Sequence, residues 1–217
     1  MLVNEAITRV IVIIIAYLIG SIPFAYIFTR LFTGKDIRQL GSGNVGGNNV
    51  FREVGAKASV PTAFFDVGKG ALAVTIAHWL LDVPFYRPDP DLYVLLAALA
   101  VIAGHMWSIY LKFSGGNGLS ATFGALAILL PRELLIVIAL LLILRVITRN
   151  TVLSVNIALL SVPISSWLME DSLLYVYFSI IIAIMLVLNF LPVAKAAISQ
   201  AESKKNLADD LLRKTKE

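Results

Sequence analysis

Cysteine is absent from the 217 residues of this chain, and charged residues make up only 15% of it. Without a thiol, the chain has no disulfide, no thiolate nucleophile, no thioester intermediate and no cysteine metal site. The charged share lies well below the roughly one quarter that is usual in soluble domains. Hydrophobic residues reach 59% and the mean hydropathy is +0.86, so the composition predicts an integral membrane protein.

The sequence also lacks histidines and acidic residues at metal-ligand spacing, and it offers no convincing serine, histidine and aspartate set for nucleophilic catalysis. We therefore expect neither a metal nor an organic cofactor. The formal net charge is +4, but the basic residues lie between apolar segments rather than in a soluble domain. We expect them to contact membrane lipids or phosphate groups, and we expect no nucleic-acid partner.

Seven apolar segments predict an all-α, polytopic membrane helical bundle with about seven transmembrane helices. They cover residues 7–32, 58–81, 92–111, 122–130, 134–147, 151–169 and 173–191. The fourth and fifth segments are shorter than the roughly 20 residues of a spanning helix, so one span through both is the alternative.

The basic residues favour seven spans with the N-terminus outside, because most of them then lie on the inner side. The inner segments contain Arg30, Lys35, Arg38, Arg52, Lys57, Lys112, Arg145, Arg149, Lys195, Lys204, Lys205, Arg213, Lys214 and Lys216. The outer segments keep Arg9, Arg87 and Arg132. We therefore predict a transmembrane domain over residues 1–192 and a cytoplasmic tail over residues 193–217, which forms either an interfacial helix or a solvated segment.

A polar, glycine-rich stretch, GSGNVGGNNVFR, occupies residues 41–52 between apolar segments. Its glycines allow successive backbone N–H groups to turn toward one point, which favours a phosphate site, although a flexible connector has the same composition. Side-chain donors come from Ser42, Asn44, Asn48, Asn49 and Arg52. A second stretch, SGGNG at residues 114–118, lies on the same predicted side, so we expect the two loops to form one site.

Asp66 and Lys69 lie three residues apart in the second apolar segment, so on a helix they share a face and neutralise each other. Charged residues at membrane depth usually face a polar cavity, which makes this pair a functional candidate, with a purely structural pair as the alternative.

His105 follows Gly104 at the inner part of the third segment, where its imidazole can donate to a phosphate or relay a proton. The alternative is a hydrogen bond to a neighbouring helix. Arg145 and Arg149 lie one turn apart at an inner boundary, where basic side chains normally extend to lipid headgroups. Arg149 is the better candidate of the two for reaching a phosphate.

Several motifs occur in a fixed order over roughly the first 125 residues. They are YLIGSIPFA at 17–25, DIR at 36–38, the loop at 41–52, DVGKG at 66–70, GHM at 104–106 and KFSGGNGLSAT at 112–122. This order and spacing resemble the bacterial membrane acyltransferases that use acyl phosphate and glycerol 3-phosphate (the PlsY type). That family has GSGNxGxTNxxR in the first loop and KFKGGKGVAT in the second.

The chain departs from the family pattern at several positions. Asn48 stands in place of a threonine, and Ser114 and Asn117 replace both lysines of the second loop. Val152 and Val155 occupy two serine positions, and the family's RHxxNxxR near the end is largely missing around residues 189–196.

The resemblance implies direct acyl transfer from acyl phosphate to glycerol 3-phosphate at an inner cell membrane, without a covalent enzyme intermediate. It implies catalytic roles for Lys69, His105 and Asn117. It implies substrate binding by Ser42, Asn44, Gly46, Gly47, Asn49, Arg52, Gly115, Gly116, Gly118 and Arg149. Its partners would be the two substrates, membrane lipids and an enzyme that produces acyl phosphate.

The departures leave a second interpretation open, in which the chain is a catalytically degenerate regulatory or lipid-binding homologue. A small anion or lipid transporter is a third interpretation that suits the Asp66 and Lys69 pair, although the sequence has no inverted repeat to support it.

Overall fold

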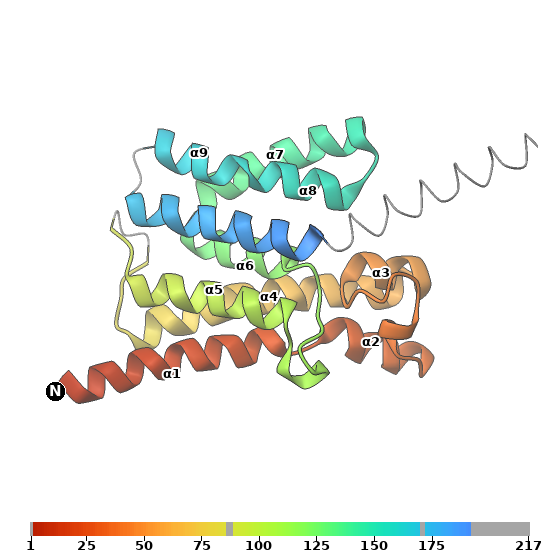
Figure 1. Ribbon diagram of the computed structural model, residues 1–217, viewed down its shortest axis with the longest axis horizontal. Coiled ribbons are helices and arrows are strands. Elements are labelled where there is room, and N and C mark those ends of the chain that lie inside the picture. Colours follow the sequence, from red (N-terminus) through yellow and green to blue (C-terminus); the bar gives the residue numbers. More distant parts are fainter. Residues whose placement is uncertain (1, 86–88, 170–171, 192–217) are drawn as a thin grey trace, which may run out of the picture.

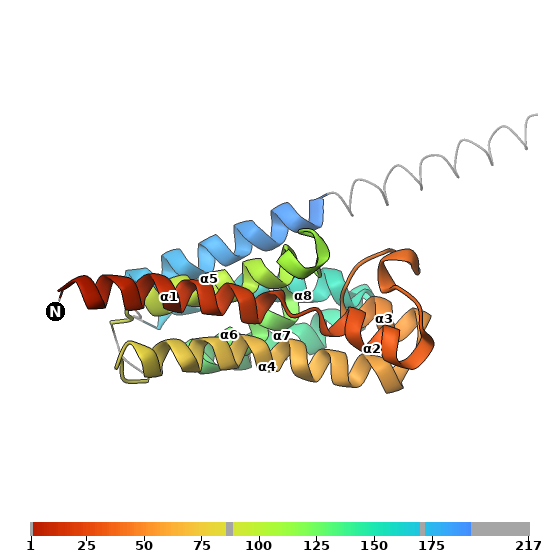
Figure 2. The same cartoon turned by 90° about the horizontal axis from the view of Figure 1, so that it is seen from below.

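The computed structural model describes residues 2–85, 89–169 and 172–191, which form a bundle of helices (Figures 1 and 2). In chain order these are α1 (Leu2–Ser21), α2 (Phe24–Thr33), η1 (Ile37–Gln39), α3 (Gly47–Glu53), α4 (Ala56–Leu80), α5 (Leu92–Met106), η2 (Ile109–Leu111), α6 (Leu119–Leu129), α7 (Pro131–Thr148), α8 (Thr151–Leu159), α9 (Ser161–Leu168) and a final helix, Leu173–Leu191. These ranges contain no β-strand, so the all-α fold class is confirmed. The predicted tail, residues 193–217, lies outside them.

Three helical stretches of the described chain are long and apolar enough to cross a membrane. They are Glu5–Thr33, Ala56–Leu80 and Leu173–Leu191. Shorter apolar helices cover Leu92–Met106, Leu119–Leu129 and Leu153–Leu168. The count of about seven spans and their orientation therefore stay predictions.

The first predicted segment is not one continuous helix. It is divided into α1 and α2 at Ile22 and Pro23. Proline has no N–H and its ring clashes with the preceding turn, so it ends α1 and starts a new helix. The first bond of the new helix runs from Ile27 N to Pro23 O at 3.0 Å.

The predicted segment over residues 151–169 is also divided, by a turn at Leu160 between α8 and α9. Pro163 explains this correction, because it cannot donate to the carbonyl four residues earlier and displaces it. The predicted separation at Pro131 is confirmed, since α6 and α7 are two helices that meet at Leu130.

Two helix pairs approach closely because a glycine lies at each crossing. A Cβ at Gly104 of α5 would collide with the carbonyl of Tyr17 in α1, and one at Gly124 of α6 would collide with that of Val67 in α4. Small residues at such crossings let helix backbones come together. These contacts fix the relative positions of α4, α5 and α6. The three helices carry the buried charged side chains and part of the pocket wall.

The core has two parts. The larger apolar cluster lies along the bundle and includes residues of α1, α4, α5, α6 and the final helix. The smaller cluster consists of Ala25, Ile37, Val45, Val50, Ala58 and Leu111. It holds α2, η1 and α3 together at one end of the bundle, beyond the C-terminal end of α1 (Figures 1 and 2). Both glycine-rich loops belong to this end.

Candidate functional site

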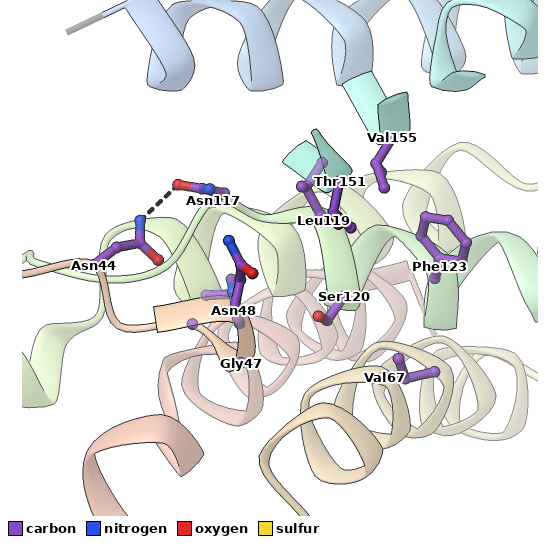
Figure 3. A pocket seen from close by; sticks show the side chains of 12 residues that line it. Asn44, Gly47, Asn48, Val67, Asn117, Leu119, Ser120, Phe123, Thr151 and Val155 are labelled. Carbon is purple, nitrogen blue, oxygen red and sulfur yellow. Dashed lines mark hydrogen bonds between the residues drawn. The ribbon is translucent and has the colours of Figure 1, made fainter. Parts of the chain in front are cut away.

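The two glycine-rich loops meet although about 70 residues separate them. Val45 N donates to Gly115 O at 3.2 Å. The side chain of Asn44 donates from Nδ2 to Oδ1 of Asn117 at 2.6 Å (Figure 3). These contacts confirm that the two loops lie together, while their membrane side and their role as one binding site stay predictions.

Asn49 holds the first loop in shape. Its Nδ2 donates to the carbonyl oxygens of Leu40 and Asn44, both at 3.0 Å. Its Oδ1 accepts from Ser42 N at 3.2 Å. Asn49 is buried, whereas Ser42 is exposed at the outside of the loop. The side-chain amide of Asn49 therefore supplies hydrogen-bond partners for backbone groups of the loop. Other polar groups of the loop remain to face the pocket.

The second loop is held by His105 and by the final helix. Gly116 N donates to His105 O at 3.0 Å, and Asn189 Nδ2 donates to Gly116 O at 3.2 Å. A Cβ at Gly116 would collide with His105 Nε2 and with the carbonyl of Val45. Only glycine lets the loop lie this close to the imidazole ring.

A pocket of about 290 Å³ opens between the two loops and helices α4, α6 and α8. Its lining consists of Asn44, Gly46, Gly47, Asn48, Val67, His105, Asn117, Leu119, Ser120, Phe123, Thr151 and Val155. Figure 3 shows the asparagine amides gathered at one end of the pocket and Phe123, Val67 and Val155 at the other. The pocket thus has a polar end and an apolar end.

The described residues that line this pocket include no lysine, arginine, aspartate or glutamate. Two exposed arginines lie close in sequence to lining residues instead. Arg52 is one helical turn after Asn48 on α3, and therefore on the same face. Arg149 is the left-handed residue that ends α7, two positions before Thr151. Neither guanidinium has an ion-pair or hydrogen-bond partner among the described residues, so both are available to an anion.

The buried charges lie behind the pocket rather than in its lining. Lys69 Nζ is 2.9 Å from Asp66 Oδ1, so the predicted pairing of these residues is confirmed. Nδ1 of His105 lies 3.6 Å from the same carboxylate oxygen. Asp66, Lys69 and His105 are exposed by 1%, 4% and 6% respectively. Of the three, His105 also borders the pocket.

The predicted site residues thus fall into groups. Those that line the pocket are Asn44, Gly46, Gly47, His105 and Asn117. Those that build the loops around it are Ser42, Asn49, Gly115, Gly116 and Gly118. Arg52 and Arg149 are exposed outside the lining, and Lys69 is buried behind it.

Three polar residues near the site were not predicted from the sequence. They are Ser120, Thr151 and Asn189. Asn48, which was expected to be a donor of the first loop, lines the pocket. Asn189 had little sequence signal, since its contact with Gly116 depends on how the final helix packs. The described residues contain no group of three or more histidine or acidic side chains that could hold a metal ion.

The fold and the pocket define a membrane helical bundle with a site suited to an amphiphilic ligand, polar at one end and apolar at the other. A family model described as glycerol-3-phosphate acyltransferase matches residues 10–199. The chain belongs to this family.

Known relatives agree with this assignment. Glycerol-3-phosphate acyltransferase 1 of Dehalococcoides mccartyi is 39% identical over 203 residues, which cover 91% of this chain and 95% of the relative. A crystal structure of PlsY, an integral membrane glycerol 3-phosphate acyltransferase, in its glycerol 3-phosphate form has a TM-score of 0.79 at 26% identity, and the match covers 88% of this chain and 92% of PlsY. The lysophosphatidic acid form of PlsY, at 24% identity and a TM-score of 0.77, shares the fold over the same coverage. The chain is an integral membrane protein.

Proposed function

We propose that the protein transfers a fatty acyl group from an acyl phosphate to glycerol 3-phosphate and releases 1-acyl-glycerol 3-phosphate and inorganic phosphate. Its family and the glycerol 3-phosphate form of the related PlsY structure support this reaction. The observation at the site that carries the proposal is the pocket between the two glycine-rich loops, because its polar and apolar ends match a phosphorylated head and an acyl chain.

In this reaction, a hydroxyl oxygen of glycerol 3-phosphate attacks the carbonyl carbon of the acyl phosphate. The ester C–O bond forms, the C–O bond to phosphate breaks, and phosphate leaves with the electron pair of that bond. We assign the hydroxyl proton to His105, whose imidazole borders the pocket. The enzyme supplies no nucleophile, so catalysis depends on orientation and on stabilising the developing negative charge.

The polar end of the pocket is assigned to the reacting groups and the phosphates. Amide donors from Asn44, Asn48 and Asn117 converge there, as do backbone groups of both loops. Arg52 and Arg149 are assigned to the phosphates as charge-assisted donors from outside the lining. The apolar end, with Phe123 and its neighbours, is assigned to the acyl chain.

The remaining predicted residues keep supporting assignments. We assign the first glycine-rich loop, with Ser42, Gly46, Gly47 and Asn49, to the phosphate of one substrate. We assign the second loop, with Gly115, Gly116 and Gly118, to the anionic group of the other substrate. Asn117 is assigned to the reaction through its amide, which replaces the family's lysine.

We place the protein in the cell inner membrane as a multi-pass protein of about seven spans, with an outer N-terminus and a cytoplasmic C-terminus. The basic residues of the predicted inner segments support this orientation. An acyl phosphate is too reactive to accumulate freely, so we propose that the enzyme that produces it delivers it from the same side.

The test is phosphate release by the purified full chain given palmitoyl phosphate and glycerol 3-phosphate. The Dehalococcoides mccartyi glycerol-3-phosphate acyltransferase 1 serves as the active control, because it covers most of this chain. We expect turnover that requires both substrates and yields the acylated glycerol 3-phosphate by mass spectrometry.

Absence of turnover from folded protein, with the control active, would contradict the proposed reaction. If that protein still bound palmitoyl phosphate, the degenerate lipid-binding homologue would replace the enzyme as the best interpretation. The two lysine positions occupied by Ser114 and Asn117 would then be the first to restore.

A further inference from the structure

The ammonium group of Lys69 contacts backbone at the break between α1 and α2. Its Nζ donates to the carbonyl oxygen of Ile22 at 2.8 Å. Ile22 lies between the two helices, so its carbonyl belongs to neither helical ladder. Ile22 is half-buried, and Lys69 supplies its carbonyl with a hydrogen-bond donor from α4. Lys69 therefore ties α4 to the break that Pro23 creates.

The carboxylate of Asp66 connects Lys69 to His105. Oδ1 of Asp66 lies 2.9 Å from Lys69 Nζ and 3.6 Å from His105 Nδ1. The opposite ring nitrogen of His105, Nε2, faces Gly116 so closely that a Cβ there would collide with it. A continuous set of contacts thus runs from the helix break through three buried side chains to the second glycine-rich loop.

We infer that Lys69 is a positioning residue for the acyl transfer, which orients the His105 ring and the second loop through Asp66 and does not touch either substrate. This inference rests on the proposed function. It is carried by the contacts of Lys69, whose ammonium group is held by Asp66 and Ile22 and is not among the groups that line the pocket. It replaces the catalytic role predicted for Lys69 from the family resemblance.

The energetics of the buried pair favour this role. If Lys69 turned toward a substrate phosphate, it would leave the Asp66 carboxylate unpaired at 1% exposure and the Ile22 carbonyl without its donor. Breaking one side of a buried ion pair is strongly unfavourable, whereas removing both charges together is often tolerated. This difference provides the test.

The experiment is a double-mutant cycle with Lys69→Met and Asp66→Asn in the full chain, measuring thermal unfolding, kcat and both KM values. Lys69→Met alone leaves an unpaired buried carboxylate, so we expect a lower Tm and little activity. In the double variant the asparagine keeps a side chain of nearly the same shape beside Nδ1 of His105, where the Asp66 carboxylate oxygen lies 3.6 Å away in the wild type. We expect its Tm to recover, the KM for glycerol 3-phosphate to stay at the wild-type value and kcat to fall about tenfold because the ring is less well fixed.

Two outcomes from the folded double variant would overturn the inference. A KM that rises about tenfold or more, or a loss of all turnover, would mean that the Lys69 ammonium contacts substrate. A kcat equal to that of the wild type would mean that the pair stabilises the fold without positioning the site.

A second measurement uses the wild-type protein and covers the case in which the double variant does not fold. Reductive methylation of lysines is mapped by mass spectrometry with and without glycerol 3-phosphate. We expect Lys69 to stay unmodified in both samples, while the exposed Lys35 and Lys57 are modified. Modification of Lys69 without substrate, whether or not substrate protects it, would contradict the inference. The methylation pattern does not depend on turnover. Failure of the proposed reaction would show in the phosphate-release assay and can therefore be distinguished from failure of the inference about Lys69.

Discussion

The side chain of Asn44 donates to that of Asn117 across 2.6 Å, and this bond joins the two glycine-rich loops at the polar end of the pocket. Asn117 occupies a position where the family pattern has lysine. A pair of amides fixes the loops without placing a charge between the substrates. In the proposed function, Arg52 and Arg149, which lie outside the lining, would supply the positive charge for the phosphates.

Asn117→Asp is expected to weaken substrate binding without loosening the loops. The carboxylate still accepts from Asn44, but its negative charge repels the phosphates in a partly desolvated pocket. We expect the KM for glycerol 3-phosphate to rise about tenfold or more at an unchanged Tm. Asn117→Lys is the matched variant, and its positive charge should lower that KM. A KM for Asn117→Asp equal to that of the wild type would show that the charge argument is wrong, because this variant keeps the acceptor for Asn44 and changes the charge.

Arg52→Ala is expected to weaken substrate binding by roughly a hundredfold while the protein stays folded. Arg52 is exposed and has no partner among the described residues, so its removal breaks no internal contact. Losing charge-assisted hydrogen bonds of about 3 kcal/mol corresponds to roughly a hundredfold loss of affinity. The change is measured as the KM for glycerol 3-phosphate and as Tm in detergent.

Lys35→Ala provides the control for that variant, because Lys35 is also exposed and basic, lies at the same end of the bundle and does not line the pocket. Its kinetics should match the wild type. Equal effects of the two substitutions would indicate a general electrostatic influence of this end rather than a phosphate contact of Arg52.

The features that follow from local rules were predictable from the sequence. Asp66 and Lys69 pair because three residues place them on one helix face. The sequence also predicted that the two loops lie close together, because both are glycine-rich and have basic residues around them, and the hydrogen bond between Asn44 and Asn117 confirms that they meet. Hydropathy does not reveal the divisions at Pro23 and Leu160, because apolar residues continue on both sides of Pro23 and Pro163, although proline is the strongest local signal for a break.

The features that depend on packing between distant segments could not be predicted. Lys69 reaches the carbonyl of Ile22, 47 residues away, and this contact exists only because α4 passes the break between α1 and α2. Asn189 reaches Gly116 across 73 residues through the position of the final helix. No periodicity or motif in a single sequence predicts a contact between residues that lie so far apart along the chain.

The pair formed by Asp36 and Arg38 predicts a pH-dependent contribution to stability. The Arg38 side chain donates to both carboxylate oxygens of Asp36, and these hydrogen bonds lower the pKa of that carboxyl. A carboxyl whose pKa is lowered by folding stabilises the fold above its unfolded pKa, and this contribution is lost as the pH falls through the folded value. The pair is only partly buried, with the side chains of Arg38 and Asp36 exposed by 37% and 14%, so solvent still screens it and we expect about 1 kcal/mol or less.

Asp36→Asn tests this sign, since the amide keeps the shape and still accepts from Arg38. Its Tm should lie slightly below that of the wild type at pH 7, and the difference should shrink at pH values below about 4, the ordinary range of aspartate. A difference at Asp36 that grows on acidification would refute the assigned pKa direction.

Gly116→Ala is expected to damage the site directly, because Gly116 packs against His105 and the first loop. The new methyl group meets the imidazole of His105 on one side and the backbone carbonyl of Val45 on the other, so both loops must shift. Displacing catalytic groups by about 1 Å can cost roughly a hundredfold in rate. We therefore expect kcat to fall by about that factor and Tm to drop, measured by phosphate release and thermal unfolding.

Gly68→Ala is the matched control in the neighbouring helix α4. Nothing lies within 4 Å of the position that its Cβ would take, and the residue is exposed in the middle of the helix. Replacing glycine by alanine at such a position usually stabilises a helix by about 0.5–1 kcal/mol. Tm should therefore rise or stay constant, with kcat unchanged. A Gly116→Ala protein with wild-type kcat would mean that the second loop and His105 can separate without cost to the reaction, and the close contact between them would lose its role in the site.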